Sequence, residues 1–574
     1  ELTYHLINKG LIGGTFGRSF SFDTNLPIEL PDKIENVIAA RIDRLEEENK
    51  RVLQTASVIG QEVDPRFLES IIEISSIADR LADLQTAEFL SVRQGPSNTK
   101  YMFRHALIRE VAYNSLVQKV RKAIHEKAAI TIEKSNPGQL EENCELLAYH
   151  YQRSGNRQKA MSFLEAANQK AIRLSALQMA METFNEAMKI LDEMDNSAPV
   201  QERRIQLVVE QYYPFLFHLK ISEYLDLLNR HRAAAINSEN PYIQMKFNIA
   251  TANCRIYLGQ LREAESATEQ AIAIADDSGH SELAVEAYVG LFFIYFMRSQ
   301  CHRMHQAKEN IFGLLEKQFS LHVYAHTSFP LILTLAEAGY CNQAISEAEK
   351  LLNMARQFSN SSIICLCLIH IALAYCLKNE PLKARDYSEQ ALSHIKTPME
   401  EGWVRNWHAY ILCRCGPLDQ GIAGLETVLE IMRQIKNRPV ETEVLNYLGE
   451  AYYLAGNTNK AAKCLANANA MAEKMDRKWC QIRAIYYLGK IALENRSRKS
   501  RQYFKKCIEM AQPIEMQAYL AKAYAGLGGY YRQHGEIEKS RHCLTKSLEI
   551  YDALDIRDEP EKVKKELAKL PEAS

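Results

Sequence analysis

The sequence predicts an all-α protein in which helical hairpins stack into an α-solenoid, with one minor β-hairpin near the N-terminus. Glycine and proline are scarce: 24 glycines and 16 prolines make up about 7% of 574 residues, against roughly 12% in average proteins. From about residue 145 onward, small residues recur with a period near 40 residues. Few chain breakers favour long helices, and a fixed period favours a repeat array.

Composition excludes several classes of protein. The formal net charge is −1, so no overall field attracts nucleic acid or an anionic membrane. The 13 cysteines are scattered and odd in number, which favours a reducing cytoplasm over a disulfide framework. The apolar run Ile363–Leu377 is shorter than the ~20 residues that span a bilayer, so we expect a buried helix and no membrane association. Glu1 is not a start methionine, and we expect this chain to be the C-terminal part of a longer protein.

The first elements are short. Pro31 and Asp32 predict the start of a helix whose apolar stripe includes Ile34, Val37, Ile38, Ile42 and Leu45. A second helix, apolar at Val52, Leu53 and Ala56, is expected to end at Gly60, and two further helices are expected at 67–72 and 77–90. Residues 91–103 alternate around a Gly-Pro-Ser-Asn turn, which predicts a β-hairpin, and a long helix is expected at 106–134. The last three helices before the hairpin, followed by the hairpin, are in the order of a winged helix.

The repeat is clearest in one copy, Leu448, Gly449, Tyr452, Gly456, Ala461, Leu465 and Ala468, and an early copy reads Ala148, Tyr151, Gly155, Ala160, Leu164 and Ala167. A small residue is expected to open each second helix, at Ala264, Ala307, Ala344, Ala384, Gly421, Ala461, Ser500 and Ser540. Their spacing runs from 37 to 43 residues. Candidate units around Ala160 and Ala180 are only 20 residues apart, and no unit is placed between residues 193 and 263.

These residues resemble the tetratricopeptide repeat, a helical hairpin whose small residues let two helices approach closely. The positions expected to pack the hairpins are Gly155, Ala160, Gly449, Tyr452, Gly456, Ala461 and Gly535, with Gly456 and Ala461 as close-approach sites. Such arrays bind proteins along a concave face, so we expect protein partners there. The tyrosines of the pairs 452/453, 486/487 and 530/531 either line that groove or pack one member inside each hairpin. Residues after Leu554 are expected to form a solvated capping helix.

Three runs near the N-terminus carry a second resemblance: PDKIENVIAARIDRL, RVLQTASVIG and YMFRHALIREVAYNSL. They resemble the segment after the nucleotide-binding domain in bacterial signalling ATPases of the STAND/AAA type, as found fused to class III adenylate/guanylate cyclases and sometimes to protein kinases. The resemblance implies an ATPase-module remnant at 1–40, a winged-helix-like domain at 41–135, adaptor hairpins at 136–200 and a repeat arm at 201–574. It also implies contact with an upstream ATPase domain and ATP or ADP in the full-length protein.

The chain itself carries no nucleotide-binding motif. The glycine cluster GLIGGTFGRS has the wrong spacing for a P-loop and lacks its lysine, so we expect neither catalysis nor a cofactor within this chain. The pairs Cys365/Cys367 and Cys413/Cys415 would diverge on helices, which favours buried cysteines over a metal site.

His105 is the main candidate site residue. The family resemblance implies that a histidine near this place contacts the β-phosphate of a nucleotide in the intact protein, and Arg109 one turn later could assist. The alternative is that His105 caps its helix and packs against Tyr113.

The charge of the helix expected at 78–90 bears on nucleic acid. It carries Asp79, Asp83 and Glu88 against Arg80 alone, which argues against DNA binding. The predicted function is a regulatory and protein-interaction segment of a signal-transduction ATPase, controlling an upstream nucleotide cyclase through a partner bound to the arm. The alternatives are a transcription-regulator ATPase arm acting through nucleic acid and a segment of an ATPase–kinase fusion.

Overall fold

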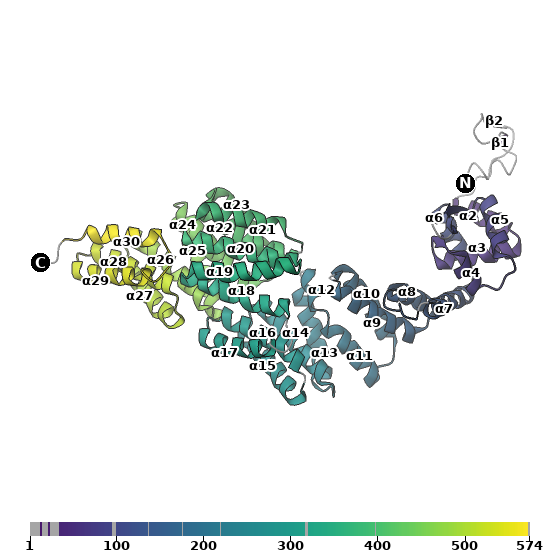
Figure 1. The fold of residues 1–574 in the computed structure, drawn as a ribbon, viewed down its shortest axis with the longest axis horizontal. Helices are drawn as coiled ribbons and strands as arrows, with labels where there is room; N and C mark the ends of the chain where they lie inside the picture. Colours follow the sequence, from purple (N-terminus) through teal and green to yellow (C-terminus); the bar gives the residue numbers. More distant parts are fainter. Residues whose placement is uncertain are drawn as a thin grey trace. The chain divides into compact units, whose positions relative to one another are not determined.

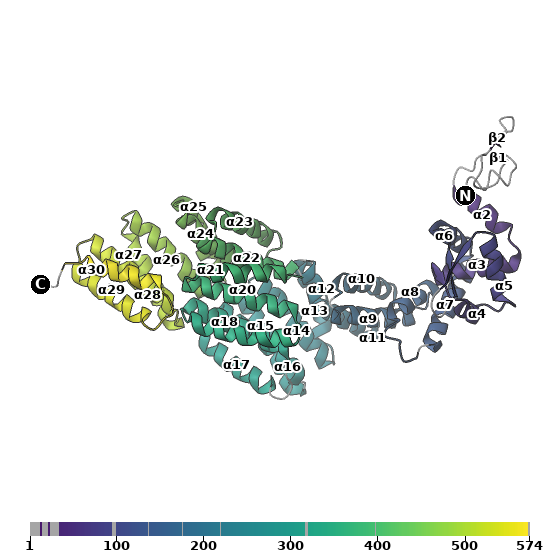
Figure 2. The same ribbon diagram turned by 45° about the horizontal axis from the view of Figure 1, so that its top comes forward.

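A computed structural model describes residues 12–13, 21–22, 34–94, 99–135, 137–174, 176–218, 220–279, 281–315, 320–396 and 398–571. The chain divides into two compact units, Glu1–Asp195 (unit 1) and Asn196–Ser574 (unit 2), which are drawn in Figure 1 and Figure 2. Helices dominate both units, and the described strands form only two small sheets. The prediction of an all-α solenoid with a minor β-hairpin is therefore confirmed.

Unit 1 contains the strands and the shorter helices. Its elements are β1 Ile12–Gly13, β2 Ser21–Phe22, α2 Ile34–Asp43, α3 Glu47–Ile59, β3 Glu62–Val63, α4 Pro65–Ile71, α5 Ile77–Thr86, β4 Leu90–Gln94, β5 Thr99–Phe103, α6 Ala106–Asn114, α7 Gln118–Ser135, α8 Cys144–Ser154, α9 Arg157–Arg173 and α10 Leu177–Glu193. β5 is the centre of an antiparallel sheet of order β3-β5-β4, with Leu90 opposite Phe103 and Glu62 opposite Met102. The predicted hairpin is confirmed, although its turn at residues 95–98 lies outside the described residues.

The predicted helices of unit 1 form, with shifted boundaries. The stripe is buried at Val37, Ile38 and Ile42, whereas Ile34 is half exposed; Pro31 and Asp32 lie outside the described residues. The helix expected to reach Leu90 ends at Thr86, because Leu90 pairs with Phe103 in the sheet. The long helix expected at 106–134 is two helices, α6 and α7. The Ser115 hydroxyl donates to the carbonyl of Ala112 where α6 ends.

Unit 2 is an array of antiparallel helices. They are α11 Ala198–Val209, α12 Tyr212–Phe217, α13 Ile221–Ile236, α14 Pro241–Tyr257, α15 Leu261–Ser278, α16 Ser281–Met297, α17 Cys301–Leu315, α18 Leu321–Ala338, α19 Cys341–Gln357, α20 Ser361–Lys378, α21 Pro381–Ser393, α22 Pro398–Cys415, α23 Leu418–Gln434, α24 Arg438–Leu454, α25 Thr458–Lys474, α26 Lys478–Glu494, α27 Lys499–Ala511, the 3₁₀ turn η1 Gln512–Ile514, α28 Gln517–Gln533, α29 Ile537–Tyr551 and α30 Asp558–Ala568. Between residues 193 and 263, where the sequence marks no repeat, α12 has only six residues, and the regular hairpins begin with the pair α14 and α15.

The hairpins have an inner and an outer layer. The first helices of neighbouring hairpins, from α14 through α28, contact one another as well as their own partners, so they form the inner layer. They are correspondingly buried on most sides; α20, α24 and α26 each bury long continuous runs of residues. α20 is the one described helix long and apolar enough to cross a bilayer, but 67% of it is buried within the array. The prediction that this run is a buried helix is confirmed.

Small residues at the start of the second helices set the repeat distance. Ala264, Ala344, Ala384 and Ala461 are fully buried at the fourth position of their helices. In α17 that position is Met304 rather than the predicted Ala307, since the Met304 N–H donates to the carbonyl of Gln300 just as the Ala264 N–H donates to that of Gln260. With Met304 as the marker the period is about 40 residues on both sides, and the uneven spacing predicted there disappears.

The seven predicted packing positions play two different roles. A Cβ on Gly449 would lie 2.5 Å from Leu465, so Gly449 is a close-approach site, and Ala160 and Ala461 are fully buried. The prediction for Gly456 is wrong in its reason: nothing lies within 4 Å of a Cβ built there, but the residue has φ +74°, a left-handed turn that favours glycine. The same reason applies to Gly155 (φ +87°) and Gly535 (φ +73°), which also end helices; the seventh position, Tyr452, is buried.

The tyrosine pairs are mostly internal. Tyr452, Tyr486, Tyr487, Tyr530 and Tyr531 are buried and Tyr453 is half-buried, so the array does not present these rings on an open groove. α30 is a helix as predicted and buries Val563 and, just beyond its end, Leu570 against the last hairpin.

Candidate functional site

The inner layer of unit 2 holds a buried arginine. Arg483, on α26, is 1% exposed, and its Nη2 donates to both carboxylate oxygens of Glu337 on α18 at 3.1 Å. Its Nε donates to the hydroxyl of Tyr519 at 2.7 Å. The guanidinium also lies over three tyrosine rings, those of Tyr410, Tyr447 and Tyr519, with centroid distances of 5.2, 4.8 and 5.8 Å. This buried charge is therefore compensated by a carboxylate, a phenol and aromatic faces.

Two further buried carboxylates extend this cluster, and their surroundings move their pKa values in opposite directions. Glu443 accepts hydrogen bonds from the Trp407 indole at 2.9 Å and the Tyr447 hydroxyl at 3.1 Å; burial raises the pKa of its carboxyl above the ordinary value. Burial also disfavours the charge on Glu450, but Arg414 at 3.0 Å, together with Arg483, outweighs it and lowers the pKa of that carboxyl.

Arg483 and Glu337 lie where the array coils back on itself, with α24 against α14 and α28 against α18, and we call this contact the seam. On one side are Ser299, Glu337, Gly339 and Asn342, and on the other Asp476, Trp479, Arg483 and Asp555. The backbone N–H of Trp479 donates to the Ser299 hydroxyl at 3.2 Å, and Arg298 pairs with Asp476 at 3.0 Å. The Asp555 N–H donates to the Gly339 carbonyl at 3.2 Å, and its carboxylate accepts from the Asn342 backbone at 2.9 Å. The seam joins residues up to 213 positions apart.

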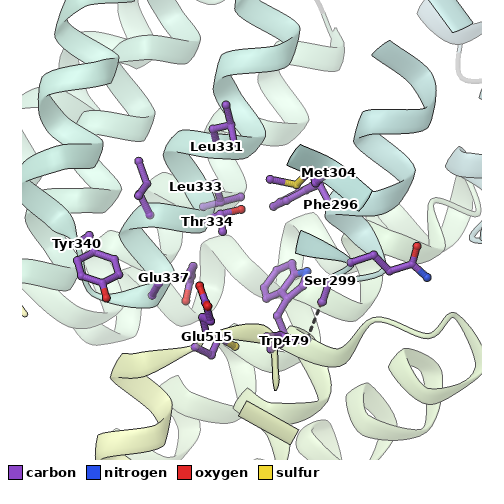
Figure 3. A pocket seen from close by; sticks show the side chains of 15 residues that line it. Phe296, Ser299, Met304, Leu331, Leu333, Thr334, Glu337, Tyr340, Trp479 and Glu515 are labelled. Carbon is purple, nitrogen blue, oxygen red and sulfur yellow. Dashed lines mark hydrogen bonds between the residues drawn. The ribbon is translucent and has the colours of Figure 1, made fainter. Parts of the chain in front are cut away.

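An apolar cavity of about 200 Å³ lies within the seam. Figure 3 shows Leu331, Leu333 and Met304 on one side of it, and Trp479 between Glu337 and Ser299 on the other. The polar members of the lining are Ser299, Gln300, Thr334, Glu337, Tyr340 and Glu515. The Trp479 indole N–H is buried and has no hydrogen-bond partner within the described part of the chain. An apolar cavity with one unpaired donor can accept an apolar group that carries a hydrogen-bond acceptor.

His105 and Arg109 lie in unit 1, at the start of α6. His105 is the N-cap residue of α6, yet its side chain makes no capping hydrogen bond, and the imidazole is exposed. Arg109 is half-buried. Tyr113, the alternative contact for His105, instead donates or accepts a hydrogen bond with His125 at 3.0 Å. The nucleotide-sensing role of His105 and Arg109 stays a prediction, and the geometry leaves the imidazole accessible.

Sequence reasoning missed a buried histidine pair in unit 1. His125 on α7 and His150 on α8 are almost fully buried, and their Nδ1 atoms are 2.9 Å apart. Burial lowers the pKa of His125 to about 3 and that of His150 to about 4. Neither residue belongs to a recognisable motif. The one signal in the sequence is that each histidine lies on the apolar face of its own helix.

The cysteines behave as small buried side chains. Cys365, Cys367 and Cys413 are buried and Cys415 is half-buried, as the helical spacing predicted. The Cys415 thiol lies 3.5 Å from the Cys376 sulfur. Among the described residues no group of three His, Cys, Asp or Glu side chains is placed to hold a metal ion.

Comparison with known proteins identifies the repeat in part of the chain. The tetratricopeptide repeat family model matches residues 400–474, which hold most of α22 and all of α23 to α25. An uncharacterized protein of Rhizobium meliloti (strain 1021) is 25% identical over 166 residues, which is 28% of this chain. The chain covers only 16% of that relative's length.

Three solved structures are similar in fold. A STAND protein with a tetratricopeptide repeat sensor from Pyrococcus horikoshii has 13% identity and a TM-score of 0.35, covering 90% of this chain and 68% of that one. A Rap protein complexed with competence and sporulation factor has 12% identity and a TM-score of 0.38, covering 71% and 98%. The APC/C hetero-tetramer Cut9–Hcn1 has 14% identity and a TM-score of 0.46, covering 78% and 87%. At this level of similarity nothing about the ligands of those proteins extends to this chain.

Proposed function

We propose that this chain is the regulatory segment of a signal-transduction ATPase, in which unit 2 binds a partner protein and an upstream nucleotide-cyclase domain provides the output. The observation that carries the binding role is the array of tetratricopeptide-like hairpins, whose family model matches residues 400–474. Helical-repeat arrays present extended surfaces, and their usual task is to bind another protein. The cyclase output rests on the three N-terminal sequence runs alone.

The order of elements in unit 1 supports a winged helix between the ATPase and the arm. Three helices, α3, α4 and α5, precede the hairpin β4–β5, and β3 completes a sheet of order β3-β5-β4. On α5, Asp79 and Asp83 are exposed, and the only cation, Arg80, pairs with Glu46 at 2.8 Å and Glu48 at 2.7 Å. An acidic helix repels the phosphates of a duplex, so this domain faces protein rather than DNA.

The nucleotide part of the proposal is tested in the full-length protein with His105→Ala. An exposed imidazole that makes no capping hydrogen bond in the described part of the chain can contact the β-phosphate of an upstream nucleotide. We expect the variant to retain less ADP on purification and to give a higher basal cyclic-nucleotide output. The matched control is His542→Ala, which removes another exposed histidine from unit 2. Equal ADP content and equal output in the variant and wild type would assign His105 no sensing role.

The nucleic-acid alternative is separated by a binding measurement. Fluorescence anisotropy of a labelled DNA duplex at low salt should show no saturable binding to this chain. Affinity that falls linearly with the logarithm of salt concentration would instead favour the transcription-regulator interpretation.

A further inference from the structure

The seam cavity combines apolar walls with a buried indole N–H that has no partner among the described residues. We propose that it receives an aromatic side chain of a partner peptide, flanked in that peptide by a cationic residue. This inference rests on the proposed function of unit 2 as a protein-binding arm, and it names the feature of the partner that unit 2 recognises.

The size and lining of the cavity define the apolar part of the ligand. Its volume is about 200 Å³, and its walls are mainly aliphatic and aromatic, including Phe296, Leu331, Leu333 and Met304. An apolar cavity of roughly 150 Å³ is large enough to bind benzene. The seam cavity therefore has room for one aromatic ring but is below the roughly 300 Å³ at which small-molecule and cofactor sites begin.

An unpaired indole N–H at the cavity indicates a peptide. Trp479 is only 8% exposed. Its indole N–H is buried and has no hydrogen-bond partner among the described residues. An unsatisfied buried donor costs about 1–3 kcal/mol, which a carbonyl oxygen entering beside the ring would offset. Figure 3 places the indole nitrogen toward Ser299, on the side of the cavity formed by Phe296 and Met304. A ring with a carbonyl a few atoms away is the arrangement in a peptide residue.

The charges at the cavity define the flanking residue. Glu337 and Glu515 are the charged members of the lining, and no lysine or arginine is among them. Glu337 is compensated by Arg483, whereas Glu515 is exposed and forms no ion pair with any residue that the structure describes. One uncompensated carboxylate beside an apolar cavity complements a cation next to the aromatic residue.

The position of the cavity gives binding a consequence for the fold. Its walls come from α16 to α18 on one side and from Trp479, η1 and the start of α28 on the other. A side chain that fills the cavity contacts both sides of the seam at once. The ligand therefore binds the array more tightly when the two sides of the seam are in contact than when they are apart, and it shifts the array toward the form with the seam closed.

The test uses the whole chain labelled with 5-fluorotryptophan, which gives one ¹⁹F signal for each of Trp403, Trp407 and Trp479. The probes are phenethylammonium, which joins a ring to a cation, phenylacetate, which joins the same ring to an anion, and the heptapeptides Gly-Gly-Arg-Phe-Arg-Gly-Gly and Gly-Gly-Arg-Ala-Arg-Gly-Gly. We expect phenethylammonium and the Phe peptide to move the Trp479 signal in a saturable way. We expect phenylacetate to bind at least twofold more weakly and the Ala peptide to leave the signal in place.

Two variants locate the effect. Ala338→Leu extends a lining side chain into the cavity and should abolish the Trp479 shift, with the melting curve followed to verify that the chain still folds. Glu515→Gln should weaken the cationic probes two- to fivefold, as expected for an exposed ion pair worth up to about 1 kcal/mol. The matched control Glu538→Gln removes an exposed carboxylate on α29, outside the cavity lining, and should change nothing.

Each outcome bears on a different statement. A shift with phenethylammonium but none with the Phe peptide would assign the cavity to a free small amine and overturn the peptide proposal. Absence of any Trp479 shift in a folded chain would overturn the cavity as a site. A Phe peptide that binds wild type and Ala338→Leu equally would place peptide binding elsewhere on unit 2, which supports the proposed function and overturns this inference. Failure of the proposed function is a separate result, in which His105→Ala changes nothing and the full-length protein binds no partner protein through unit 2.

Discussion

The buried histidines between α7 and α8 make the stability of unit 1 depend on pH. His125 and His150 have folded-state pKa values of about 3 and 4, below the value of about 6.5 in an unfolded chain. A group whose pKa is depressed by folding favours the unfolded state as soon as that state binds its proton. Their stabilisation is therefore complete above pH 6.5 and is lost as the pH falls toward 4, by up to about 1.4 kcal/mol per pH unit for each histidine.

This pH dependence is measured by hydrogen exchange of the α7 and α8 amides between pH 7 and pH 5, after correction for the intrinsic exchange rate. His150→Asn keeps a neutral polar partner for His125 and removes one titrating group, so it should make the pH slope shallower by about 1.4 kcal/mol per pH unit. Arg121 and Arg153, which also disfavour protonation of His125, stay in place. His542→Asn, at an exposed site, is the control. Parallel slopes for wild type and His150→Asn would show that the pair does not set the pH response.

Single residues also show what sequence reasoning can reach. His105 stood out because a family motif surrounds it, and the structure places it where the sequence indicated, at the start of α6. The pair His125 and His150 has no motif, since its members come from different helices and share only burial. Trp479 is similar, because its indole N–H, which has no partner among the residues that the structure describes, is buried by packing between distant repeats.

Within one hairpin, glycines act for two different physical reasons, and substitutions separate them. Gly449→Ala would bring a Cβ to 2.5 Å from Leu465, so overpacking of about 1–3 kcal/mol is expected. Gly456→Ala meets no atom but forces a non-glycine residue into a left-handed turn, at a cost of about 1–2 kcal/mol. Ala461→Leu, at a fully buried site, should be destabilising for the same reason as Gly449→Ala.

Chemical denaturation of double variants distinguishes overpacking from backbone strain. Leu465→Ala should couple favourably with Gly449→Ala, since it removes the atoms that clash, and should show no coupling with Gly456→Ala. Gly313→Ala is the control, because an added Cβ there meets nothing within 4 Å on a helix and should be neutral or stabilising. Equal coupling of Leu465→Ala to both glycines would refute the distinction.

At the scale of helices, the sequence predicted the period and the buried small residues, because both are local consequences of close helix packing. It misplaced elements where tertiary contacts decide. The helix after His105 was expected to be continuous, but it breaks into α6 and α7 at Ser115, whose hydroxyl accepts a hydrogen bond from the Gln54 amide on α3. In α17 a methionine occupies a position that elsewhere takes a small residue, so the pattern pointed to Ala307 in place of Met304.

Across unit 2, the seam changes how the array responds to damage. In an open array each repeat contacts only its neighbours, so a local defect between about residues 440 and 499 would stay local. Here α24 also contacts α14, and α28 contacts α18, which lie far away in the sequence. Contacts of this separation have no sequence signature, because each seam residue is unremarkable within its own repeat. We therefore expect backbone amides on both sides of the seam to lose protection against hydrogen exchange when the contacts of one side are weakened.

The Arg483–Glu337 pair provides the test of that expectation. Arg483→Met alone leaves the Glu337 carboxylate buried without its cation, which should cost about 3–5 kcal/mol. The double variant Arg483→Met/Glu337→Leu removes both charges, so most of that loss should be recovered. Lys350→Met, which breaks an exposed pair with Glu347, should change stability by less than about 1 kcal/mol.

Hydrogen exchange resolves whether the loss crosses the seam. If the seam couples the two sides, Arg483→Met raises exchange in α18 as well as in α26, although the two paired residues are 146 positions apart. The double variant should restore protection in both helices together, since neither side then holds an unpaired charge. Faster exchange confined to α26 and its sequence neighbours, with α18 unchanged, would mean that the array behaves as an open chain of repeats and that ligand binding at the seam cavity cannot close it.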